Sequence, residues 1–267
     1  MDRRTFLKGA AAAALVAVPS YALGSAYHFV IERRHASLDG LAAPIRVAFA
    51  ADLHYGPYIG AGSVEAWVDA TLAQRPDLIL LGGDIVDAHV EHGSTGPLLR
   101  QLERLRAPHG TWAVWGNHDR MAFGDMRRFR AGLAAAGVQV LVNDHGRPRS
   151  DLVLAGIDDL LQGSPDLPRA LRGRPDGTAT LLLSHNPDAL PRVPLDVGLT
   201  LAGHTHGGQV CLPGGVPIYT SSRYGRRFAK GWVEGPARGY VSRGLGVSFL
   251  PVRFACPAEL TVLDLTP

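Results

Sequence analysis

Apolar runs alternate with amphipathic segments from Pro44 onward. The run IRVAFAADLH (45–54) is continuously apolar and then ends in polar residues, as a strand buried on both faces does. The next segment, SVEAWVDATLAQR (63–75), has apolar residues at helical spacing, and Ser63 fits the position of an N-cap. A second apolar run (77–87) follows. The pattern therefore predicts strand, loop and helix in repeated order.

The same alternation continues through the rest of the chain. We expect further helices at 96–106, 125–137 and 166–172, and further strands at 110–119, 138–142, 152–157, 179–184, 197–202 and 259–265. Gly137 fits the end of the helix that precedes it. Alternating strands and helices are typical of a layered α/β domain, so we expect one such domain over residues 45–267.

The first residues form a separate region. Arg3, Arg4 and Lys8 precede an apolar stretch, and the sequence RRTFLK resembles the twin-arginine export signal of bacteria. No formally charged residue occurs between Lys8 and Glu32, and such a stretch is long enough to span a bilayer. We therefore assign residues 1–44 to an export signal or an uncleaved membrane anchor followed by a linker. The expected location is the periplasm or the outer face of the membrane.

Composition and charge exclude some classes of function. The 267 residues are 46% hydrophobic, which is enough for a sizeable core and unlike a disordered chain. The formal net charge of +3 is too small to predict nucleic acid as a partner. The two cysteines, Cys211 and Cys256, form no C-x-x-C motif, which disfavours a thiolate zinc site. The two cysteines form either one disulfide or two buried thiols. The sequence favours no particular oligomeric state.

Residue types that bind metals follow the predicted strands. They are Asp52 and His54 after the first strand, Asp84 and Asp87 after the second, Asn117 and His118 after the third, and His185, His204 and His206 after two later strands. Ligands bind at the carboxyl ends of strands in open α/β sheets, so we expect these side chains to lie together. An extended strand would point His204 and His206 to one face, and Gly207 and Gly208 would leave room for a substrate.

The ordered motifs D-x-H, G-G-D-x-x-D, G-N-H-D, H-N and G-H-T-H resemble those of the calcineurin-like metallophosphoesterases, over roughly residues 45–265. The resemblance implies a layered α/β/β/α sandwich without a large cap domain. It also implies two divalent metal ions and a hydroxide between them that attacks phosphorus. The implied ligands are Asp52, His54 and His206 for one ion, Asn117, His185 and His204 for the other, and Asp84 as the bridge. Carboxylate, imidazole and carboxamide ligands without thiolate favour Mn²⁺, with Fe or Zn²⁺ as alternatives.

Two further residues receive catalytic roles from the resemblance. His118 would protonate the leaving group or stabilise the phosphoryl oxygens, and Asp87 would hold the His118 ring in orientation. Asp119 is either a support for the ligands or a partner in a structural ion pair. The residues that bind the rest of the substrate are not identified by the sequence.

The expected substrate is a phosphoester in an open site. No insertion between Asn117 and His185 is long enough for a cap, which favours phosphodiesters or bulky head groups over small monoesters. From Ser221 to Ala255 the sequence has seven basic residues and one acidic residue. These basic residues would bind a second phosphate, bind an anionic lipid or membrane surface, or form a basic face that is only solvated.

Several alternatives stay open at this point. One is a phosphomonoesterase, and another is a hydrolase like UDP-2,3-diacylglucosamine pyrophosphatase of lipid A synthesis. That second reaction is cytoplasmic, so an export signal disfavours it. A non-catalytic binding module on the same fold would be expected to have lost ligands, and none is lost here. A metallo-β-lactamase-like hydrolase would carry H-x-H-x-D-H, which the sequence lacks.

Overall fold

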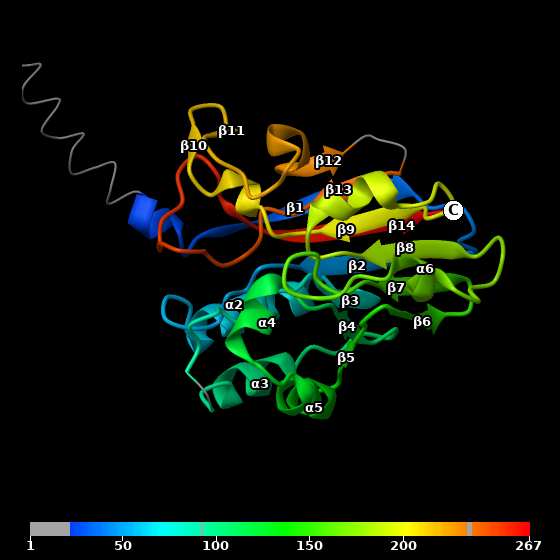
Figure 1. The fold of residues 1–267 in the computed structure, drawn as a ribbon, viewed down its shortest axis with the longest axis horizontal. Helices are drawn as coiled ribbons and strands as arrows, with labels where there is room; N and C mark the ends of the chain where they lie inside the picture. The colour runs from blue at the N-terminus through cyan, green and yellow to red at the C-terminus, as the bar shows by residue number, and fades with distance from the viewer. Residues whose placement is uncertain (1–21, 92, 234–236) are drawn as a thin grey trace, which may run out of the picture.

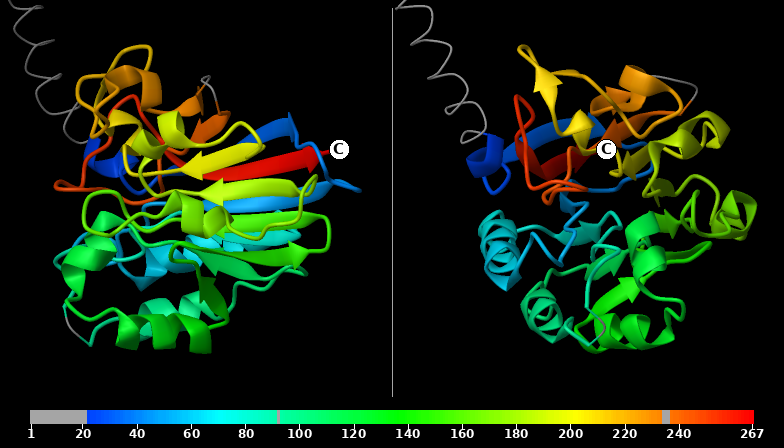
Figure 2. Two further views of the ribbon diagram at one scale, coloured as in Figure 1. Left: turned by 45° about the vertical axis from the view of Figure 1, so that its right-hand side comes forward. Right: turned by 60° about the vertical axis from the view of Figure 1, so that its left-hand side comes forward.

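Two β-sheets packed face to face form the centre of the molecule, and helices cover their outer sides (Figures 1 and 2). The computed structural model describes residues 22–91, 93–233 and 237–267. Residues 1–21, which contain most of the expected signal or anchor, lie outside this part. The arrangement confirms the α/β/β/α sandwich. No helix within the described ranges combines the length and the apolar character needed to cross a membrane.

The first sheet has six strands in the order β1-β14-β2-β3-β4-β5. The strands are β1 (Phe29–Ser37), β14 (Ala258–Thr266), β2 (Ile45–Ala50), β3 (Leu78–Leu81), β4 (Thr111–Ala113) and β5 (Val138–Val140). The helices on this side are α2 (Ala61–Ala73), α3 (Gly96–Leu102), α4 (Asn117–Ala122) and α5 (Arg127–Ala135). Trp67, Leu98 and Phe129 of these helices are buried in one apolar cluster with Ile79 of the sheet. Burial of such side chains is the main stabilising contribution here.

The second sheet has the order β12-β13-β9-β8-β7-β6. Its strands are β6 (Asp144–Arg149), β7 (Leu152–Gly156), β8 (Ala179–Leu183), β9 (Leu199–Ala202), β12 (Gly231–Val233) and β13 (Gly239–Val241). The short helices here are α6 (Leu167–Leu171), η1 (Pro187–Arg192), η2 (His206–Gly208) and η3 (Gly225–Phe228), and β10 (Cys211–Leu212) pairs with β11 (Val216–Pro217). Phe49 and Leu80 of the first sheet share a buried cluster with Leu154 and Leu201 of the second.

The structure differs from the expected elements at several places. Residues 29–37 lie in the range assigned to the linker, yet they form β1 and pair in parallel with β14 from Phe29↔Ala258 onward. The folded part therefore begins before residue 45. Helix α2 starts at Ala61 with Gly60 as its N-cap, so the N-cap expected at Ser63 is wrong. The backbone N–H of Ser63 instead donates to the Gly60 carbonyl at 3.2 Å.

The chain between Asn117 and His185 contains no cap domain. This range is fully described, and it builds helices α4, α5 and α6 and strands β5 to β8, which all belong to the layers of the sandwich. The carboxyl ends of β2, β3, β4, β8 and β9 therefore have no additional domain from this range above them.

Candidate metal centre

Loops from both sheets meet beyond the carboxyl ends of β2, β3, β4, β8 and β9. Backbone hydrogen bonds hold these loops together. The N–H of Asp52 donates to Gly83 at 3.0 Å, and the N–H of His54 donates to the carbonyl of Asp84 at 2.9 Å. The N–H of Gly203 donates to the carbonyl of His185 at 2.9 Å. The structure thus brings the predicted ligands to one edge, as the strand order predicts.

Five of the seven predicted ligands have a left-handed backbone. Their φ angles are +55° at Asp52, +49° at His54, +49° at Asp84, +72° at His204 and +51° at His206. Positive φ is uncommon outside glycine, and residues held there cluster at functional sites. Strand β9 ends at Ala202, so the expected extended strand over His204 and His206 is wrong. A tight left-handed turn, rather than strand alternation, directs these two imidazoles.

The two glycines after His206 serve this turn and its packing. Gly207 has φ +63°, and a Cβ there would lie 2.8 Å from Sγ of Cys256. Gly208 has φ +89°, and a Cβ there would lie 2.6 Å from Cβ of Pro217. Any side chain at either position would be strained and would collide with neighbouring residues. The expectation that these glycines leave room for a substrate is therefore wrong.

Asp52, His54 and His206 form the first group of ligand atoms. One ligand atom from each lies within 4.8 Å of the others, and all three residues are buried. The Nε2 atoms of His54 and His206 are 3.0 Å apart. The carboxylate of Asp52 accepts the backbone N–H of His204 at 2.9 Å, which fixes the position of the carboxylate.

Asp84, His185 and His204 form a second group with the same spacing limit. Nε2 of His185 lies 3.2 Å from Oδ2 of Asp84, and Nδ1 of His185 lies 2.8 Å from the carbonyl of Gly82. A ring N–H at Nδ1 donates to that carbonyl, so a bound cation would have to displace only the proton that Asp84 favours on Nε2. Asp84 also joins a third group with His54 and His118, so it lies between the other two groups.

Buried polar atoms without partners mark the same place. Among the described residues, Nε2 of His204 and Oδ1 of Asn117 are buried and have no hydrogen-bond partner. Leaving such atoms unpaired costs about 1–3 kcal/mol each, so they call for a partner. Nitrogen and oxygen donors arranged around a shared carboxylate fit two divalent cations. The residues present therefore suit the metal pair that the sequence predicts.

The charges around Asp84 determine the protonation of the histidines. Burial opposes the charged form of His185, but the carboxylates of Asp84 and Asp52 raise its pKa to about 10. Burial and the charge of His185 lower the pKa of His204 to about 3. Burial, His54 and Arg253 hold the pKa of His206 well below its usual range. His204 and His206 are thus neutral near pH 7, as metal binding requires.

His118 lies at the edge of the centre and is half-buried. Its Nδ1 accepts the backbone N–H of Ala88 at 3.2 Å, so a neutral ring carries its proton on Nε2. Oδ2 of Asp87 lies 3.5 Å from this Nδ1 and 3.4 Å from Nδ1 of His54. Burial opposes the charged ring, but Asp87 and Asp84 outweigh it and raise the pKa of His118. Asp87 thus contacts His118, as its predicted role of holding the His118 ring in orientation requires. It also contacts His54.

Asp119 forms hydrogen bonds with the backbone of two loops that carry predicted ligands. Its carboxylate accepts the N–H of Val86 and the N–H of Gly116, each at 2.9 Å, and it is completely buried. No salt bridge to Asp119 occurs among the described residues, so of the two expected roles the structure favours support of the ligand loops. Burial and the nearby charge of Asp84 raise the pKa of Asp119 to about 7.

Two acidic residues after β7 also lie near the centre, although the sequence did not single them out. Asp158 accepts Nε–H of Arg120 at 2.9 Å, which ties β7 to helix α4. Asp159 is buried, it contributes to the raised pKa of His185, and its Oδ1 has no hydrogen-bond partner. Their position at the end of a parallel strand was the available signal, since β7 has the same direction as β8.

The basic segment from Ser221 to Ala255 does not form one continuous cationic wall. Arg253 is completely buried and donates to backbone carbonyls, including that of Gly246 at 2.7 Å. Arg243 is paired with Glu259 at 2.6 Å and with Glu32 at 2.7 Å. These contacts are structural. The exposed arginines of this segment are Arg223, Arg226, Arg227 and Arg238.

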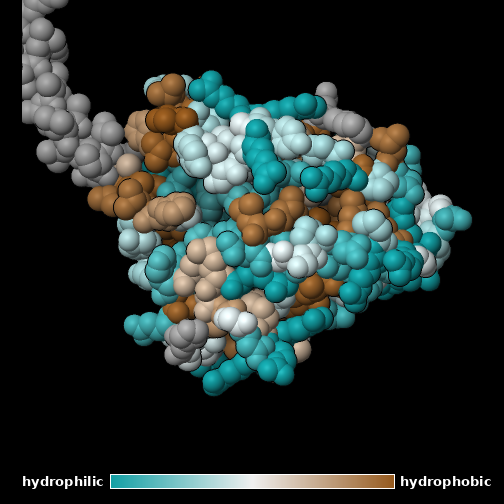
Figure 3. Space-filling model, in the orientation of Figure 1, coloured by the Kyte–Doolittle hydropathy of each residue, from teal (hydrophilic) through white to brown (hydrophobic). Residues whose placement is uncertain are grey.

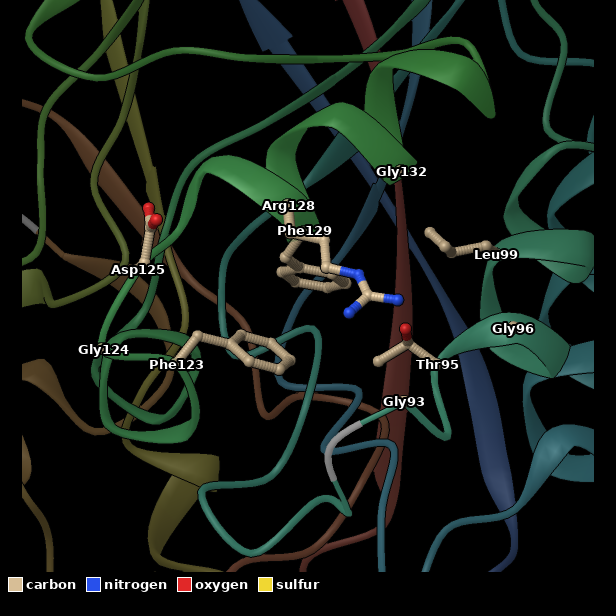
Figure 4. A pocket seen from close by; sticks show the side chains of 10 residues that line it. All are labelled: Gly93, Thr95, Gly96, Leu99, Phe123, Gly124, Asp125, Arg128, Phe129 and Gly132. Carbon is tan, nitrogen blue, oxygen red and sulfur yellow. The ribbon is translucent and has the colours of Figure 1, made fainter.

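A separate hollow lies between α3 and α5. Its volume is about 700 Å³, and its walls include Leu99, Phe123 and Phe129, with the Arg128 side chain extending into it (Figure 4). None of the predicted metal ligands lines this hollow. The metal centre is therefore a distinct feature of the surface at the strand ends.

Comparison with known proteins identifies the family. Residues 45–208 match the model of the calcineurin-like phosphoesterase family, and residues 1–19 match that of the TAT (twin-arginine translocation) pathway signal sequence. The chain is 34% identical to the uncharacterized metallophosphoesterase YkuE of Bacillus subtilis, over 99% of this chain and 98% of that protein. It is also 34% identical to phosphodiesterase YaeI of Escherichia coli, over 99% of both.

A solved structure of a dimetal phosphatase from Danio rerio is similar at 13% identity and a TM-score of 0.49, covering 83% of this chain and 98% of that one. The N-terminal match supports export through the twin-arginine pathway. Because the family model covers more than half of the chain and two relatives match nearly all of it, the chain belongs to the calcineurin-like phosphoesterases, which are hydrolases of phosphoesters.

Proposed function

We propose that this protein is an exported phosphodiesterase that uses two divalent metal ions, with Mn²⁺ as the best activator. The observation that carries this proposal is the set of three ligand groups, in which the group of His54, Asp84 and His118 overlaps each of the other two by one residue. The relative named phosphodiesterase YaeI, similar along its whole length, supports the same reaction class. Two bound divalent ions would lower the pKa of a water molecule and offset the charge of the phosphoryl oxygens.

The residues of this chain supply the remaining chemistry. As the acid, His118 acts in its charged form, which Asp87 and Asp84 favour by raising its pKa, and Nε2 carries the proton that is transferred. That proton goes to the oxygen of the leaving alcohol when the bond to phosphorus breaks. Asp87 stabilises the charged ring of His118 from the opposite side, at 3.5 Å. Asp84 accepts the backbone N–H of His118 at 2.7 Å, so the acid and the bridging carboxylate keep a fixed spacing.

An open site favours diesters. The described chain between Asn117 and His185 places no domain over the strand ends, so both substituents of a phosphodiester have access. A dianionic monoester needs additional cationic groups close to its oxygens, and Arg243 and Arg253 are engaged in structural contacts. We further propose that the enzyme works on the outer side of the cytoplasmic membrane, in keeping with its export signal.

The test compares two chromogenic substrates. We expect kcat/KM for bis(p-nitrophenyl) phosphate to exceed kcat/KM for p-nitrophenyl phosphate at saturating Mn²⁺. The Asp84→Asn protein serves as the control for contaminating phosphatases. A clear preference for the monoester would overturn the proposal and indicate a phosphomonoesterase. Hydrolysis of UDP-2,3-diacylglucosamine without hydrolysis of the simple diester would instead favour a pyrophosphatase acting on a lipid precursor.

A further inference from the structure

Exposed apolar side chains gather around the short β10–β11 hairpin. We call this set the apolar rim, and it consists of Leu23, Tyr27, Leu212, Val216, Ile218, Tyr219, Phe249 and Leu250. Phe249 is 83% exposed and Tyr219 is 73% exposed. Figure 3 shows hydrophobic surface at the upper left, around β10 and β11 and beside the N-terminal end of the described chain. Soluble proteins rarely leave such a contiguous apolar area uncovered.

Hydrogen bonds hold the segments of the apolar rim in one surface. The side-chain amide of Gln209, next to β10, donates to the carbonyls of Ser248 and Leu250 at 3.0 and 3.1 Å. The N–H of Arg253 donates to the carbonyl of Ala22 at 2.9 Å, which joins the same loop to the N-terminal turn. The three segments of the rim are therefore neighbours in space, although they are far apart in the sequence.

The chain itself indicates what covers the rim. The described structure begins at Ala22, within the rim, and the sequence before it contains the apolar stretch Gly9–Val18. The rim thus includes Leu23 and Tyr27, which follow this apolar stretch closely in the sequence. A lipid bilayer is the partner that would accept both the apolar segment and the apolar rim.

The charge near the rim fits the same partner. Among the basic residues from 221 to 255, Arg243 and Arg253 are used in structural contacts, whereas three arginines of the loop after β11 are exposed. Arg223 and Arg226 are exposed, and Nε–H of Arg226 donates to the carbonyl of Pro217 in β11 at 3.2 Å. Basic residues beside an apolar surface are attracted to anionic phospholipid head groups, and tyrosine side chains favour the interface of a bilayer.

We propose that the apolar rim docks on a bilayer that contains anionic phospholipid, with Ile218, Tyr219, Phe249 and Leu250 in the interface. The ring centroids of Phe249 and His118 lie 6.5 Å apart, so docking brings the metal centre to the level of the lipid head groups. Such a position gives the enzyme access to phosphodiesters presented at a membrane surface. Docking is measured without turnover, so it is tested separately from the proposed reaction.

The first experiment measures whether individual positions of the apolar rim insert into a bilayer. Cysteine is introduced in the full-length protein as Ile218→Cys or Phe249→Cys and labelled with nitrobenzoxadiazole. The control is Leu195→Cys, which is 76% exposed and precedes the amino-terminal end of β9, away from the rim. The native Cys211 and Cys256 are both buried and should stay unlabelled. The N-terminal segment is the same in all three proteins, so it cannot account for differences between them.

With vesicles of equimolar phosphatidylcholine and phosphatidylglycerol, we expect a blue shift and stronger emission at positions 218 and 249 and no change at 195. Vesicle partitioning of the Ile218→Ser/Tyr219→Ser protein should fall roughly tenfold or more. Leu195→Ser should leave partitioning unchanged. Both proteins should hydrolyse bis(p-nitrophenyl) phosphate like the unmodified enzyme, which excludes misfolding as the cause.

Two outcomes would overturn the proposal. The labels at 218 and 249 could stay unaltered while the protein sediments with the vesicles, in which case the N-terminal segment alone attaches it. Alternatively, the labels could respond to protein concentration without vesicles, together with a dimeric mass in sedimentation equilibrium. The rim would then be an interface between two copies of the chain.

Discussion

The Nε2 atoms of His54 and His206 lie 3.0 Å apart, although 152 residues separate them in the sequence. Both rings are buried, and the pKa of His206 is held well below its usual range by burial, His54 and Arg253. Two ring nitrogens at this spacing need a proton or a cation between them. With Asp52 they form a three-residue group that fits one divalent ion.

Metal content is the most direct prediction. We expect about two divalent ions per chain, loss of activity after chelation and best recovery with Mn²⁺. His206→Ala should reduce the content to about one ion, because Asp84, His185 and His204 are not altered. Elemental analysis measures this, and His35→Ala, with an exposed ring in β1, is the control. Two tightly held ions in the His206→Ala protein would contradict the assignment of His206 to one ion of the pair.

Removal of the proton donor should separate catalysis from metal binding. We expect His118→Asn to retain both ions and to lower kcat roughly 10²- to 10⁴-fold, the usual range for a general acid. Asp84→Asn should lose metal instead, since a neutral amide bridges two cations poorly. Comparison of kcat with metal content in the two variants provides the measurement. Near-normal turnover by His118→Asn on a diester with a poor leaving group would exclude His118 as the acid.

The position of the ligands at strand ends was predictable, but their backbone was not. Alternating strands and helices place Asp52, Asp84 and His185 at one sheet edge, because parallel strands share their carboxyl ends. Left-handed conformations outside glycine are uncommon even at Asp and His, where they are enriched, so the turn through His204 and His206 was wrongly expected to be a strand. Such strain is imposed by the surrounding loops rather than by local preference.

Long-range contacts explain the other differences. Strand β1 carries Glu32 and two arginines and follows a signal-like segment, so its sequence resembles a polar linker. Its pairing with β14, at the other end of the chain, makes it a strand. The apolar rim likewise depends on Gln209 holding the loop 248–250, a contact between segments that the sequence pattern leaves unrelated.

The export signal is tested by a substitution that preserves charge. We expect Arg3→Lys/Arg4→Lys to leave active enzyme in the cytoplasm, because the signal requires the arginine pair itself. Arg33→Lys/Arg34→Lys is a matched control, since this second pair lies in β1 of the folded part. Cell fractionation with an activity assay measures the outcome. Normal export of the first variant would show that the twin-arginine match is not used.

The buried thiols should react slowly and with a strong pH dependence. Burial, together with the neighbouring Cys256, raises the pKa of Cys211 to about 11 from an ordinary value of 9.0. The thiolate fraction of Cys211 at pH 8 is then about a hundredfold below that of a free cysteine. We expect the rate at which iodoacetamide alkylates Cys211 to rise about tenfold per pH unit up to pH 10. Mass spectrometry measures this rate. A plateau near pH 9, as in the urea-unfolded control, would contradict this pKa.

Arg253 should be among the most sensitive positions for stability, because its guanidinium is completely buried. It donates to the carbonyls of His206, Gly244 and Gly246 and so holds the turn through His206 against the loop that leads to the apolar rim. Methionine has a similar length but no donors, and Arg253→Met would leave these carbonyls buried without partners.

We expect Arg253→Met to lower the free energy of unfolding by about 3 kcal/mol or more, measured by urea denaturation in the presence of chelator. Arg192→Met, at an exposed position of η1, should change it by less than about 0.5 kcal/mol. Metal affinity should fall with stability, since the carbonyl of His206 loses its donor. Unfolding free energies that agree between the two variants would mean that water replaces the guanidinium, and that the turn through His206 is held by its glycines alone.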